Sequence, residues 1–428
     1  MKIIDLGING EGVGKEDGKV FFVKNALPEE DVEIEVLKEN KNFSFAKATK
    51  IKTKSPDRVD PLCPYFGICG GCQLQHLAYE KQLEFKRGLV KNTLKKVGEI
   101  ETDVDLTIPS DEIYFYRNKS VFPFYVDAKV LSIGMFEESS HNLVDITECK
   151  IAKQGINKIL KISREYFKSN KNFALKYLVV REINNKFLIT IVASKNIKLE
   201  AYAAKLKENN IDFSLNLNVN KVDDSILSNN YINIYGENLI RLNEFDLKTS
   251  VNSASFMQVN DSIKQRLYIF VLNEIDKNSN VVDAYCGAGL LSGMIAQKSK
   301  YVYGVEISKD AIQRANKLIE DNNIKNATFI CGDCKDEIPK LLKNIEDDFT
   351  IILDPPRAGC NQLVLNSVID TKPSKIIYVS CNPITLAKDL KILTKEYQIK
   401  KVQPFDMFPQ TSNVETVVIL QKIQKWRI

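Results

Sequence analysis

The sequence predicts an α/β fold for the last part of the chain, preceded by a small β-barrel and an α+β middle region. Three apolar runs carry the α/β prediction, and each stops at small, polar or proline residues: 281–289, 351–357 and 378–383. Strands of an open parallel sheet end in this way, because their carboxyl ends form the ligand-binding edge. From Phe256 onward the pattern becomes strand, helix, strand, whereas the earlier residues show short alternating strands.

The size of the chain predicts several domains. A chain of 428 residues is too long for one ordinary core, and we expect domains at 1–54, 55–245 and 246–428. The sequence has no run of eighteen apolar residues, and its first residues lack the apolar stretch of a signal peptide. We therefore expect a soluble, cytoplasmic protein with reduced thiols. Its nine cysteines are then core thiols, metal ligands or nucleophiles, not a disulfide framework.

The first domain is predicted from short strands at 3–6, 19–23 and 31–37, with a glycine-rich turn at 9–14. Strands of this length and spacing favour a small closed barrel, a fold that commonly binds single-stranded nucleic acid. The net charge of +5 is mild, but lysines cluster between Lys38 and Arg58 together with Phe43 and Phe45. This stretch is either a solvated strand edge or a surface for RNA phosphates and stacked bases.

A metal site is predicted at the start of the middle domain. Cys63, Cys69 and Cys72 follow the spacing C-x5-C-x2-C, and nearby glycines allow the loop to fold around one centre. Cys149 is the remaining cysteine in this half of the chain and is the candidate fourth ligand. Four thiolates suit zinc or an iron-sulfur cluster, and the spacing alone leaves both open, along with loosely buried thiols.

Two basic segments of the middle domain have an ordinary and a functional interpretation. Residues 79–96 have helical spacing with lysines around an apolar face, which usually indicates a solvated helix. Residues 114–124 mix aromatic and basic side chains, as expected of a strand that stacks RNA bases or of a core strand with exposed Arg117 and Lys119. The strands expected at 187–192 and 231–235 carry no evident chemistry.

The stretch from Asp283 to Gly289 predicts a cofactor site. Gly287 and Gly289 give a bare-backbone turn after a strand, as in NAD or S-adenosylmethionine sites, although the third glycine of the NAD pattern is displaced. Glu306 ends the next strand, where an acid can accept hydrogen bonds from ribose hydroxyls, and Asp333 ends the one after, near the expected adenine. Three acids at successive strand ends strongly favour ligand binding.

The third and fourth strand ends predict the reaction. Enzymes that methylate an exocyclic amine place an aromatic residue after Pro-Pro, and here Asp354-Pro355-Pro356 is followed by Arg357. Carbon 5 of uracil needs a thiolate to add to carbon 6 before it can attack a methyl group, and then a base to remove its proton. Cys381 and Glu415 fit these roles. The rival nucleophile is Cys360, whereas Cys286, Cys331 and Cys334 have the pattern of packing thiols.

Two family resemblances follow from these motifs. The first domain resembles the TRAM domain, at Gly10, Gly12, Gly14, 17–19 and 26–29. The rest is similar to the RNA uracil-5-methyltransferase family. The matching segments are Gln258 in 256–260, the 283–289 loop, 354–357, Ser380-Cys381-Asn382-Pro383, 406–409 and Glu415. With its TRAM-like start and four cysteines, the chain looks like the 23S ribosomal RNA branch, which carries a 4Fe-4S cluster.

The resemblance implies roles for individual residues. Cys381 would be the nucleophile and Glu415 the base; Cys63, Cys69, Cys72 and Cys149 would hold the cluster. The residues expected around S-adenosylmethionine or the flipped base are Gln258, Tyr285, Glu306, Asp333 and Asp354, with Gly287 and Gly289 in the turn. Leu290 stands where the family often has a cofactor-contacting Asn. Gln410 and Asn413 replace histidines found in relatives, which leaves Glu415 without a competing base.

The expected function is S-adenosylmethionine-dependent C5-methylation of a flipped uridine in 23S ribosomal RNA. Transfer RNA is the alternative substrate. Two other classes remain open at this point: a radical enzyme that uses its cluster in catalysis, although the C-x3-C-x2-C spacing is absent, and a non-catalytic RNA-binding or assembly protein that retains the cofactor fold.

Overall fold

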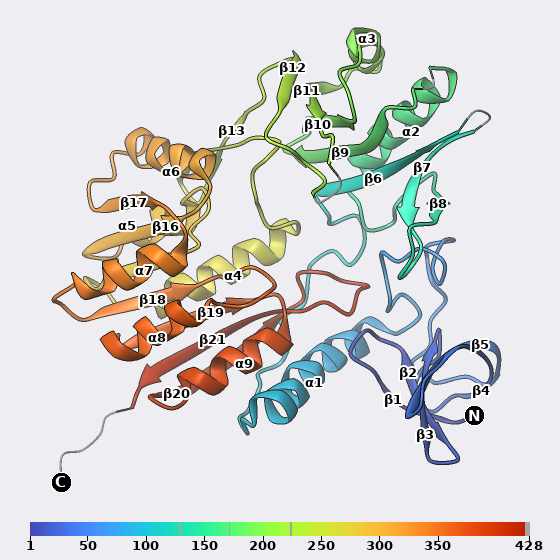
Figure 1. The fold of residues 1–428 in the computed structure, drawn as a ribbon, viewed down its shortest axis with the longest axis horizontal. Helices are drawn as coiled ribbons and strands as arrows, with labels where there is room; N and C mark the ends of the chain where they lie inside the picture. Colours follow the sequence, from blue (N-terminus) through green and yellow to red (C-terminus); the bar gives the residue numbers. More distant parts are fainter. Residues whose placement is uncertain (128–129, 171, 223–224, 424–428) are drawn as a thin grey trace.

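The computed structural model describes residues 1–127, 130–170, 172–222 and 225–423. Within these ranges the strands form a five-stranded sheet, two seven-stranded sheets and a two-stranded hairpin. Figure 1 shows the five-stranded sheet at one end of the molecule and the last seven-stranded sheet at the other. The other seven-stranded sheet, the middle sheet, lies beside both. None of the helices in the described ranges combines the length and the apolar surface needed to cross a bilayer.

The first sheet is a small barrel. Its strands, in the order β1-β2-β3-β5-β4, are β1 (Ile3–Leu6), β2 (Gly12–Glu16), β3 (Lys19–Lys24), β4 (Asp31–Glu39) and β5 (Phe43–Thr53). A bridge between Lys2 and Asp31 joins the two edges, and Ile3, Val23 and Val32 fill the interior. Phe43 and Phe45 contact Phe22 and each other, so the predicted aromatic pair forms a packed cluster of rings.

The middle sheet has helices on one face. Its strand order is β12-β11-β10-β9-β6-β7-β8. The strands are β6 (Lys119–Val126), β7 (Leu131–Phe136), β8 (Leu143–Asp145), β9 (Leu175–Ile183), β10 (Lys186–Ala193), β11 (Asp212–Val219) and β12 (Tyr231–Tyr235). Helices α2 (Gln154–Ser169) and α3 (Glu200–Glu208) bury their apolar sides against it in one core. A hairpin of β13 (Ile240–Glu244) and β14 (Leu247–Val251) leads on to the last sheet.

The last sheet has the strand order β17-β16-β15-β18-β19-β21-β20. The strands are β15 (Asn280–Ala284), β16 (Tyr301–Glu306), β17 (Ala327–Cys331), β18 (Phe349–Leu353), β19 (Lys375–Ser380), β20 (Tyr397–Phe405) and β21 (Glu415–Lys422). The first five are parallel, and β21 and β20 are antiparallel to their neighbours. The chain runs from β15 outward in both directions, so the strand order reverses between β15 and β18, where such sheets bind ligands.

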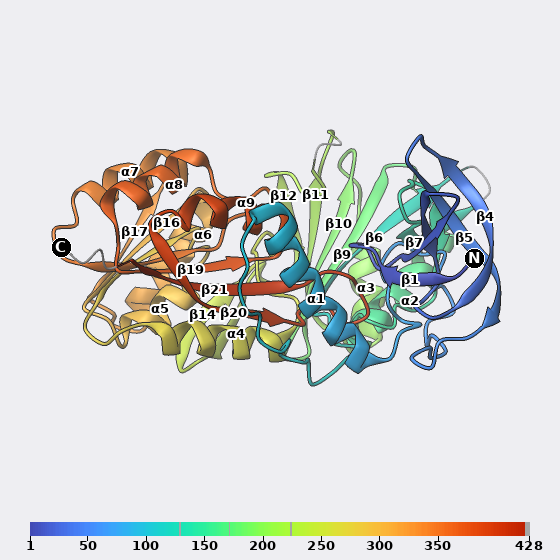
Figure 2. The same ribbon diagram turned by 90° about the horizontal axis from the view of Figure 1, so that it is seen from below.

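Helices cover both faces of the last sheet (Figure 2). One core contains α4 (Asp261–Glu274) and α5 (Leu290–Ala296), and α6 (Lys309–Asp321) packs beside α5. The core on the other face contains α7 (Cys334–Lys343), α8 (Gln362–Thr371) and α9 (Pro383–Leu393). The apolar strands are buried on both sides, as expected for a parallel sheet. These layers confirm the predicted fold class.

Helix α1 (Tyr79–Gly98) lies far from the last sheet in sequence but packs on it. Its Val90 and Leu94 belong to the same core as α9. Further along, the Asp105 and Ile108 N–H groups donate hydrogen bonds to the carbonyls of Val402 and Pro404 on the edge strand β20. Residues 79–108 lie within the stretch 55–245 that was predicted as a middle domain, and they extend the last sheet and its helical layer.

Candidate functional site

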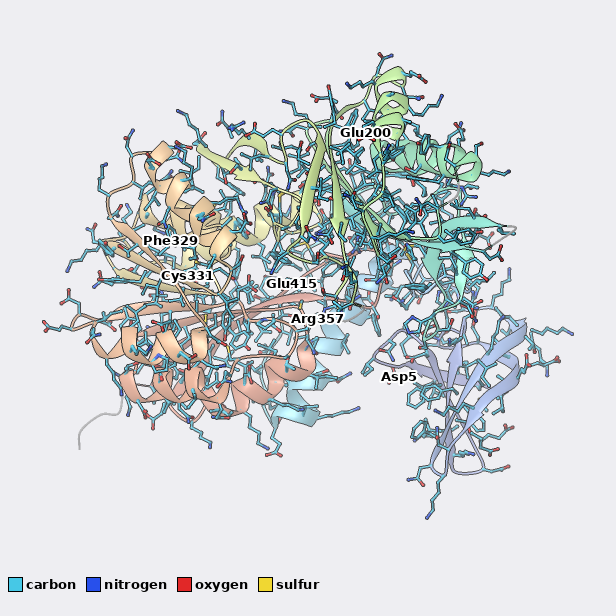
Figure 3. The ribbon with its side chains drawn as sticks, turned by 45° about the horizontal axis from the view of Figure 1, so that its top comes forward. Asp5, Glu200, Phe329, Cys331, Arg357 and Glu415 are labelled. Atoms are coloured by element: carbon cyan, nitrogen blue, oxygen red, sulfur yellow. The ribbon has the colours of Figure 1, made fainter. Side chains whose placement is uncertain are left out.

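The carboxyl edge of the last sheet collects polar side chains from four strands. Asp283 lies near the end of β15, Glu306 ends β16, and Asp354 and Cys381 directly follow β18 and β19. These strands are neighbours in the order β16-β15-β18-β19, so the four side chains line one edge. Figure 3 shows Glu415 and Arg357 on the part of this edge that faces the middle sheet.

The turn after β15 has the backbone shape that its glycines predict. Gly287 and Gly289 adopt φ values of 54° and 75°, and the Gly287 N–H donates to Oε2 of Glu306 at 3.3 Å. An added Cβ on Gly287 would have no neighbour within 4 Å, so the turn faces open space. Carboxylates beside an open glycine turn fit the ribose and the amino-acid part of S-adenosylmethionine.

Asp283 is buried beneath this turn and anchors it. Ser292 of α5 donates a hydrogen bond to its Oδ2 at 2.5 Å. Burial raises the pKa of Asp283 to about 6, the hydrogen bond from Ser292 opposes that shift, and the nearby charge of Glu306 adds to it. Two acids thus stand close together at the carboxyl ends of β15 and β16, where a ligand with a positive group would stabilise the ionised form of both.

The two glycines make a matched pair for a stability test. Gly289→Ala places a Cβ 2.9 Å from Ala315 and Phe329, whereas Gly287→Ala places one in open space. Both substitutions should lower the free energy of unfolding by about 1–2 kcal/mol, because alanine must adopt a left-handed backbone. Only Gly289→Ala should add a further loss of about 1–3 kcal/mol from overpacking. We expect urea unfolding to show a clearly larger loss of stability for Gly289→Ala. Equal losses would contradict this interpretation of the turn.

Other residues expected near the cofactor also make contacts within the protein. Asp333 caps α7 by accepting a hydrogen bond from the Lys335 N–H at 3.0 Å, and that hydrogen bond, together with the Lys335 ammonium, lowers its pKa. Gln258 is buried before α4, and its carbonyl accepts a hydrogen bond from Asn118 at 3.1 Å. Leu290 packs in a small apolar cluster with Leu247 and Met294, which gives this departure from the family a structural role.

Cys381 lies between β19 and α9 on a turn that hydrogen bonds hold in place. Asn382 caps α9 by accepting from the Ile384 N–H at 3.0 Å, and its side-chain amide donates to the Arg357 carbonyl at 3.1 Å. Burial raises the pKa of the Cys381 thiol, and the negative charge of Glu415 raises it further. The Arg357 guanidinium lowers it through its charge and a hydrogen bond. Arg357 is therefore the group that favours the thiolate.

Glu415 reaches the same place from the last strand of the chain. It starts β21, where Thr416 pairs with Ser380 of β19, and continuing this register sets Glu415 beside Cys381. Its side chain is only 3% exposed. Burial raises its pKa well above the ordinary value, as does Asp354, whereas Arg357 lowers it. A carboxyl with a raised pKa next to a thiol is suited to proton transfer near neutral pH.

The sequence did not predict a role for Arg357 beside the candidate nucleophile; the residue only argued against methylation of an exocyclic amine. The structure places Arg357 near both Cys381 and Glu415. The signal was present, because Arg357 directly follows the strand-end motif Asp354-Pro355-Pro356 on the same sheet edge.

Asp354 predicts a measurable effect on stability. Burial raises its pKa to about 7, with a contribution from Asp283. A carboxyl with a raised folded-state pKa favours folding when protonated, and this contribution is lost as the pH rises from 3.8 through about 7. We expect Asp354→Asn to stabilise the cofactor-free protein by about 1–2 kcal/mol at pH 8. In thermal unfolding scans the gain should shrink steadily from pH 8 to pH 5, and a constant gain would contradict this assignment.

The rival thiol Cys360 lies in a different environment. Its N–H donates to Oδ2 of Asp389 at 2.8 Å, and Tyr378 donates to the same oxygen at 2.5 Å. Its side chain packs against the core that contains α7, α8 and α9. Burial raises the pKa of the Cys360 thiol to about 12, although hydrogen bonds with Tyr378 and Tyr285 lower it. The structure joins Cys360 to a tyrosine and aspartate network, whereas Cys381 faces Glu415 and Arg357.

The four cysteines of the first half come together. Cys63, Cys69, Cys72 and Cys149 line one cavity, together with apolar side chains that include Phe66, Met135 and Ile146. The loop is held by the Cys69 N–H, which donates to the Tyr65 carbonyl at 2.9 Å, and by the Gly71 N–H, which donates to Sγ of Cys69 at 3.4 Å.

Within the described ranges, no group of three or more His, Cys, Asp or Glu side chains is arranged to hold a metal ion, so the structure does not confirm the predicted metal site. Burial raises the pKa of Cys69 to about 11, and it also raises the pKa values of Cys72 and Cys149.

Comparison with known proteins gives matches along nearly the whole chain. A family model described as tRNA (Uracil-5-)-methyltransferase matches residues 78–423, and a TRAM domain model matches residues 2–49. An RNA methyltransferase of Clostridium acetobutylicum is 35% identical over 99% of this chain and 96% of its own length. One of Listeria innocua is 35% identical over 98% of this chain and 96% of its own.

A solved structure has the same overall fold. The tRNA (uracil-54, C5)-methyltransferase of Pyrococcus abyssi, in complex with S-adenosyl-L-homocysteine, superposes with a TM-score of 0.77 and 27% sequence identity. The match covers 98% of this chain and 99% of that one. These matches confirm the predicted fold class, the TRAM domain and a cofactor site for S-adenosylmethionine.

Proposed function

The chain belongs to the RNA uracil-5-methyltransferase family, whose members use S-adenosylmethionine, and we propose that it methylates its target uridine through Cys381 and Glu415. The observation that carries this proposal is the meeting of Cys381, Glu415 and Arg357 at one sheet edge, beside the open glycine turn. A nucleophile, a base and a cation that favours the thiolate are the groups that the reaction requires.

The proposed reaction proceeds by addition, methyl transfer and elimination. The thiolate of Cys381 adds to carbon 6 of the uracil ring, and the electron pair of the 5,6 double bond moves toward the carbonyl at carbon 4. Bound S-adenosylmethionine supplies the electrophilic methyl group for carbon 5. Glu415 then removes the proton from carbon 5, the double bond forms again and the thiolate leaves. Arg357 stabilises the thiolate at the start and at the end of this sequence.

A trapping experiment tests the mechanism. In RNA that contains 5-fluorouridine, fluorine at carbon 5 cannot leave as a proton does, so the reaction should stall after methyl transfer, with the RNA still bound to Cys381. We expect an SDS-resistant protein–RNA adduct that requires S-adenosylmethionine, with the modified peptide containing Cys381. An adduct on Cys360, or active methylation without any adduct, would contradict the proposal. The same experiment with no methylation of any RNA would favour a non-catalytic RNA-binding protein.

The proposed acceptor is 23S ribosomal RNA, and transfer RNA is the second candidate. The four cysteines support the first, because they carry the resemblance to the ribosomal RNA branch. The second is favoured by the Pyrococcus abyssi structure, which is named for a tRNA position. Incubating the enzyme with each purified, unmodified RNA and a labelled methyl donor distinguishes them: label in transfer RNA alone would overturn the ribosomal proposal.

We propose that the barrel at 1–54 and the domain at 55–245 grip RNA on either side of the target, while 246–428 carries out the chemistry. The target uridine must be unstacked to reach a sheet edge that faces the middle sheet. In the barrel, the basic strand β5 carries lysines that can contact RNA phosphates. Methylation of a short single-stranded RNA as fast as of the folded substrate would contradict this division of labour.

We also propose a 4Fe-4S cluster held by Cys63, Cys69, Cys72 and Cys149. Its support is the convergence of four thiols on one small, mostly apolar cavity. Iron and sulfide analysis of protein purified without oxygen should show loss of both in Cys72→Ser and retention in Cys331→Ser, because Cys331 is exposed and distant in sequence. We expect the role to be structural, so Cys72→Ser should lose RNA affinity or thermal stability, and unchanged values would refute that role.

A further inference from the structure

The loop between β20 and β21, residues 406–414, delivers Glu415 to the catalytic edge, and residues far away in sequence hold it. The N–H groups of Gln73 and Leu74 both donate to the carbonyl of Gln410, at 3.1 and 3.0 Å. Gln73 directly follows Cys72, so the cysteine loop and the Glu415 loop share a pair of backbone hydrogen bonds.

The side chain of Gln82 on α1 strengthens this connection. It is 1% exposed, and its Nε2 donates to the carbonyls of Leu74 and Leu77 and to Oε1 of Gln410, at 3.1, 2.8 and 3.0 Å. In return its Oε1 accepts from the Gln410 N–H at 3.0 Å. One buried amide therefore joins the end of the cysteine loop to the loop that carries the base.

A buried ion pair holds the other end of the same loop. Lys86 of α1 pairs with Asp406, and both side chains are fully buried. The Lys86 ammonium also donates to the Phe408 carbonyl at 2.9 Å, and the Tyr79 hydroxyl donates to Asp406 at 2.8 Å. A buried charge pair of this kind is costly to break, because either partner alone would remain buried and unpaired.

The backbone of the loop needs this support. Gln410 has φ of 71°, a left-handed conformation that a non-glycine side chain adopts only when its surroundings impose it. The Tyr116 hydroxyl donates to the neighbouring Pro409 carbonyl at 3.0 Å. Residues 409 and 410 are therefore fixed by contacts from outside the last sheet, five residues before the predicted base.

We propose that Gln82 is a positioning residue for Glu415, and that through Gln82 the cysteine loop sets the rate at which the carbon-5 proton is removed. This inference rests on the proposed function, since it assumes that Glu415 is the base. A separate set of hydrogen bonds, between Asn382, Ile384 and Arg357, holds Cys381. Loss of the Gln82 contacts should therefore slow product release and leave the addition and methyl-transfer steps near normal.

The test separates these steps in a single turnover with labelled methyl donor and unmodified RNA. For Gln82→Met, which keeps side-chain length but removes the amide, we expect methyl transfer within about threefold of wild type. Release of free methylated RNA should slow by at least about tenfold, because general base catalysis contributes about 10²–10⁴-fold. The methylated RNA should meanwhile accumulate as an SDS-resistant adduct with the protein.

Two further variants serve as a control and as a second way to weaken the contact between Gln82 and Gln410. Asn92→Met is the matched control, since it removes an exposed, uncharged amide from the same helix and should behave as wild type. Gln410→Asn is a milder change: asparagine tolerates the left-handed backbone, but its shorter side chain withdraws the acceptor from Gln82. It should show the same selective slowing of release if Gln82→Met proves too unstable to purify.

The outcomes distinguish this inference from the proposed function. Glu415→Gln serves as the reference, because it should accumulate the adduct whenever Glu415 is the base. An adduct in Glu415→Gln with normal release in Gln82→Met and Gln410→Asn would overturn the inference alone. Equal slowing of methyl transfer and release would also overturn it, since that indicates general loss of active protein. Free product released at the wild-type rate by Glu415→Gln would overturn the assigned base.

Discussion

Cys381→Ala should abolish methyl transfer, with a loss of at least about 10⁴-fold in single-turnover rate. Without a sulfur to add at carbon 6, carbon 5 of uracil is too weak a nucleophile to take the methyl group. The fold should survive, because the neighbouring turn is held by Asn382 and Arg357 and not by the thiol. The measurement is label transfer from S-adenosylmethionine to RNA, with cofactor binding by calorimetry as a check on the folded state.

Two other cysteine variants complete this experiment. Cys331→Ala should keep wild-type activity, because Cys331 is exposed at the end of β17. Cys360→Ala tests the rival nucleophile; it should still form the 5-fluorouridine adduct, since its thiol belongs to the network of Tyr378 and Asp389. A fully active Cys381→Ala, or a Cys360→Ala protein that forms no adduct, would reverse the assignment of the nucleophile.

Glu415→Gln should stop the reaction after methyl transfer. Glutamine has nearly the same shape but cannot take a proton, so the methylated base should stay attached to Cys381. We expect release of free product to fall by about 10²–10⁴-fold, with most of the enzyme found as a covalent adduct after one turnover. Gel electrophoresis in SDS measures the adduct directly.

The pH dependence of release gives an independent check on Glu415. Burial and Asp354 raise the pKa of Glu415 well above its ordinary value, and only the ionised form can accept a proton. The release rate of the wild-type enzyme should therefore rise with pH until this carboxyl is ionised. The slow residual release of Glu415→Gln should not follow the same curve, and superimposable pH profiles would point to another base.

The sequence predicted which side chains share the carboxyl edge of the last sheet, because the information there is local. Each of Asp283, Asp354 and Cys381 follows an apolar run within a few residues, and parallel strands bring such ends together whatever the rest of the fold. The convergence of the four cysteines was also predicted, since three lie in one glycine-rich loop. In both cases a short motif and one general rule of sheet or loop geometry were sufficient.

The support of the Glu415 loop could not be predicted in this way. Helix α1 has the composition of a solvated helix, and Lys86 and Gln82 are residues usually found at the surface. Their burial depends on Asp406 and Gln410, which lie more than 300 residues away. No periodicity within 79–96 indicates that pairing.

Asp333 shows the reverse case: an acid after a strand was interpreted as a ligand contact, and the structure shows that it also caps a helix.

The placement of α1 also has a consequence for synthesis. Lys86 leaves the ribosome 320 residues before its partner Asp406, an interval of roughly 15–65 s at ordinary elongation rates. Until α9 emerges late in that interval, the apolar side of α1, with Val90 and Leu94, lacks the helix that it packs against. The barrel can fold early, but the helix must wait until β20 has been synthesised. A nascent chain of this protein should therefore engage chaperones at α1, and should release them only after β20 emerges.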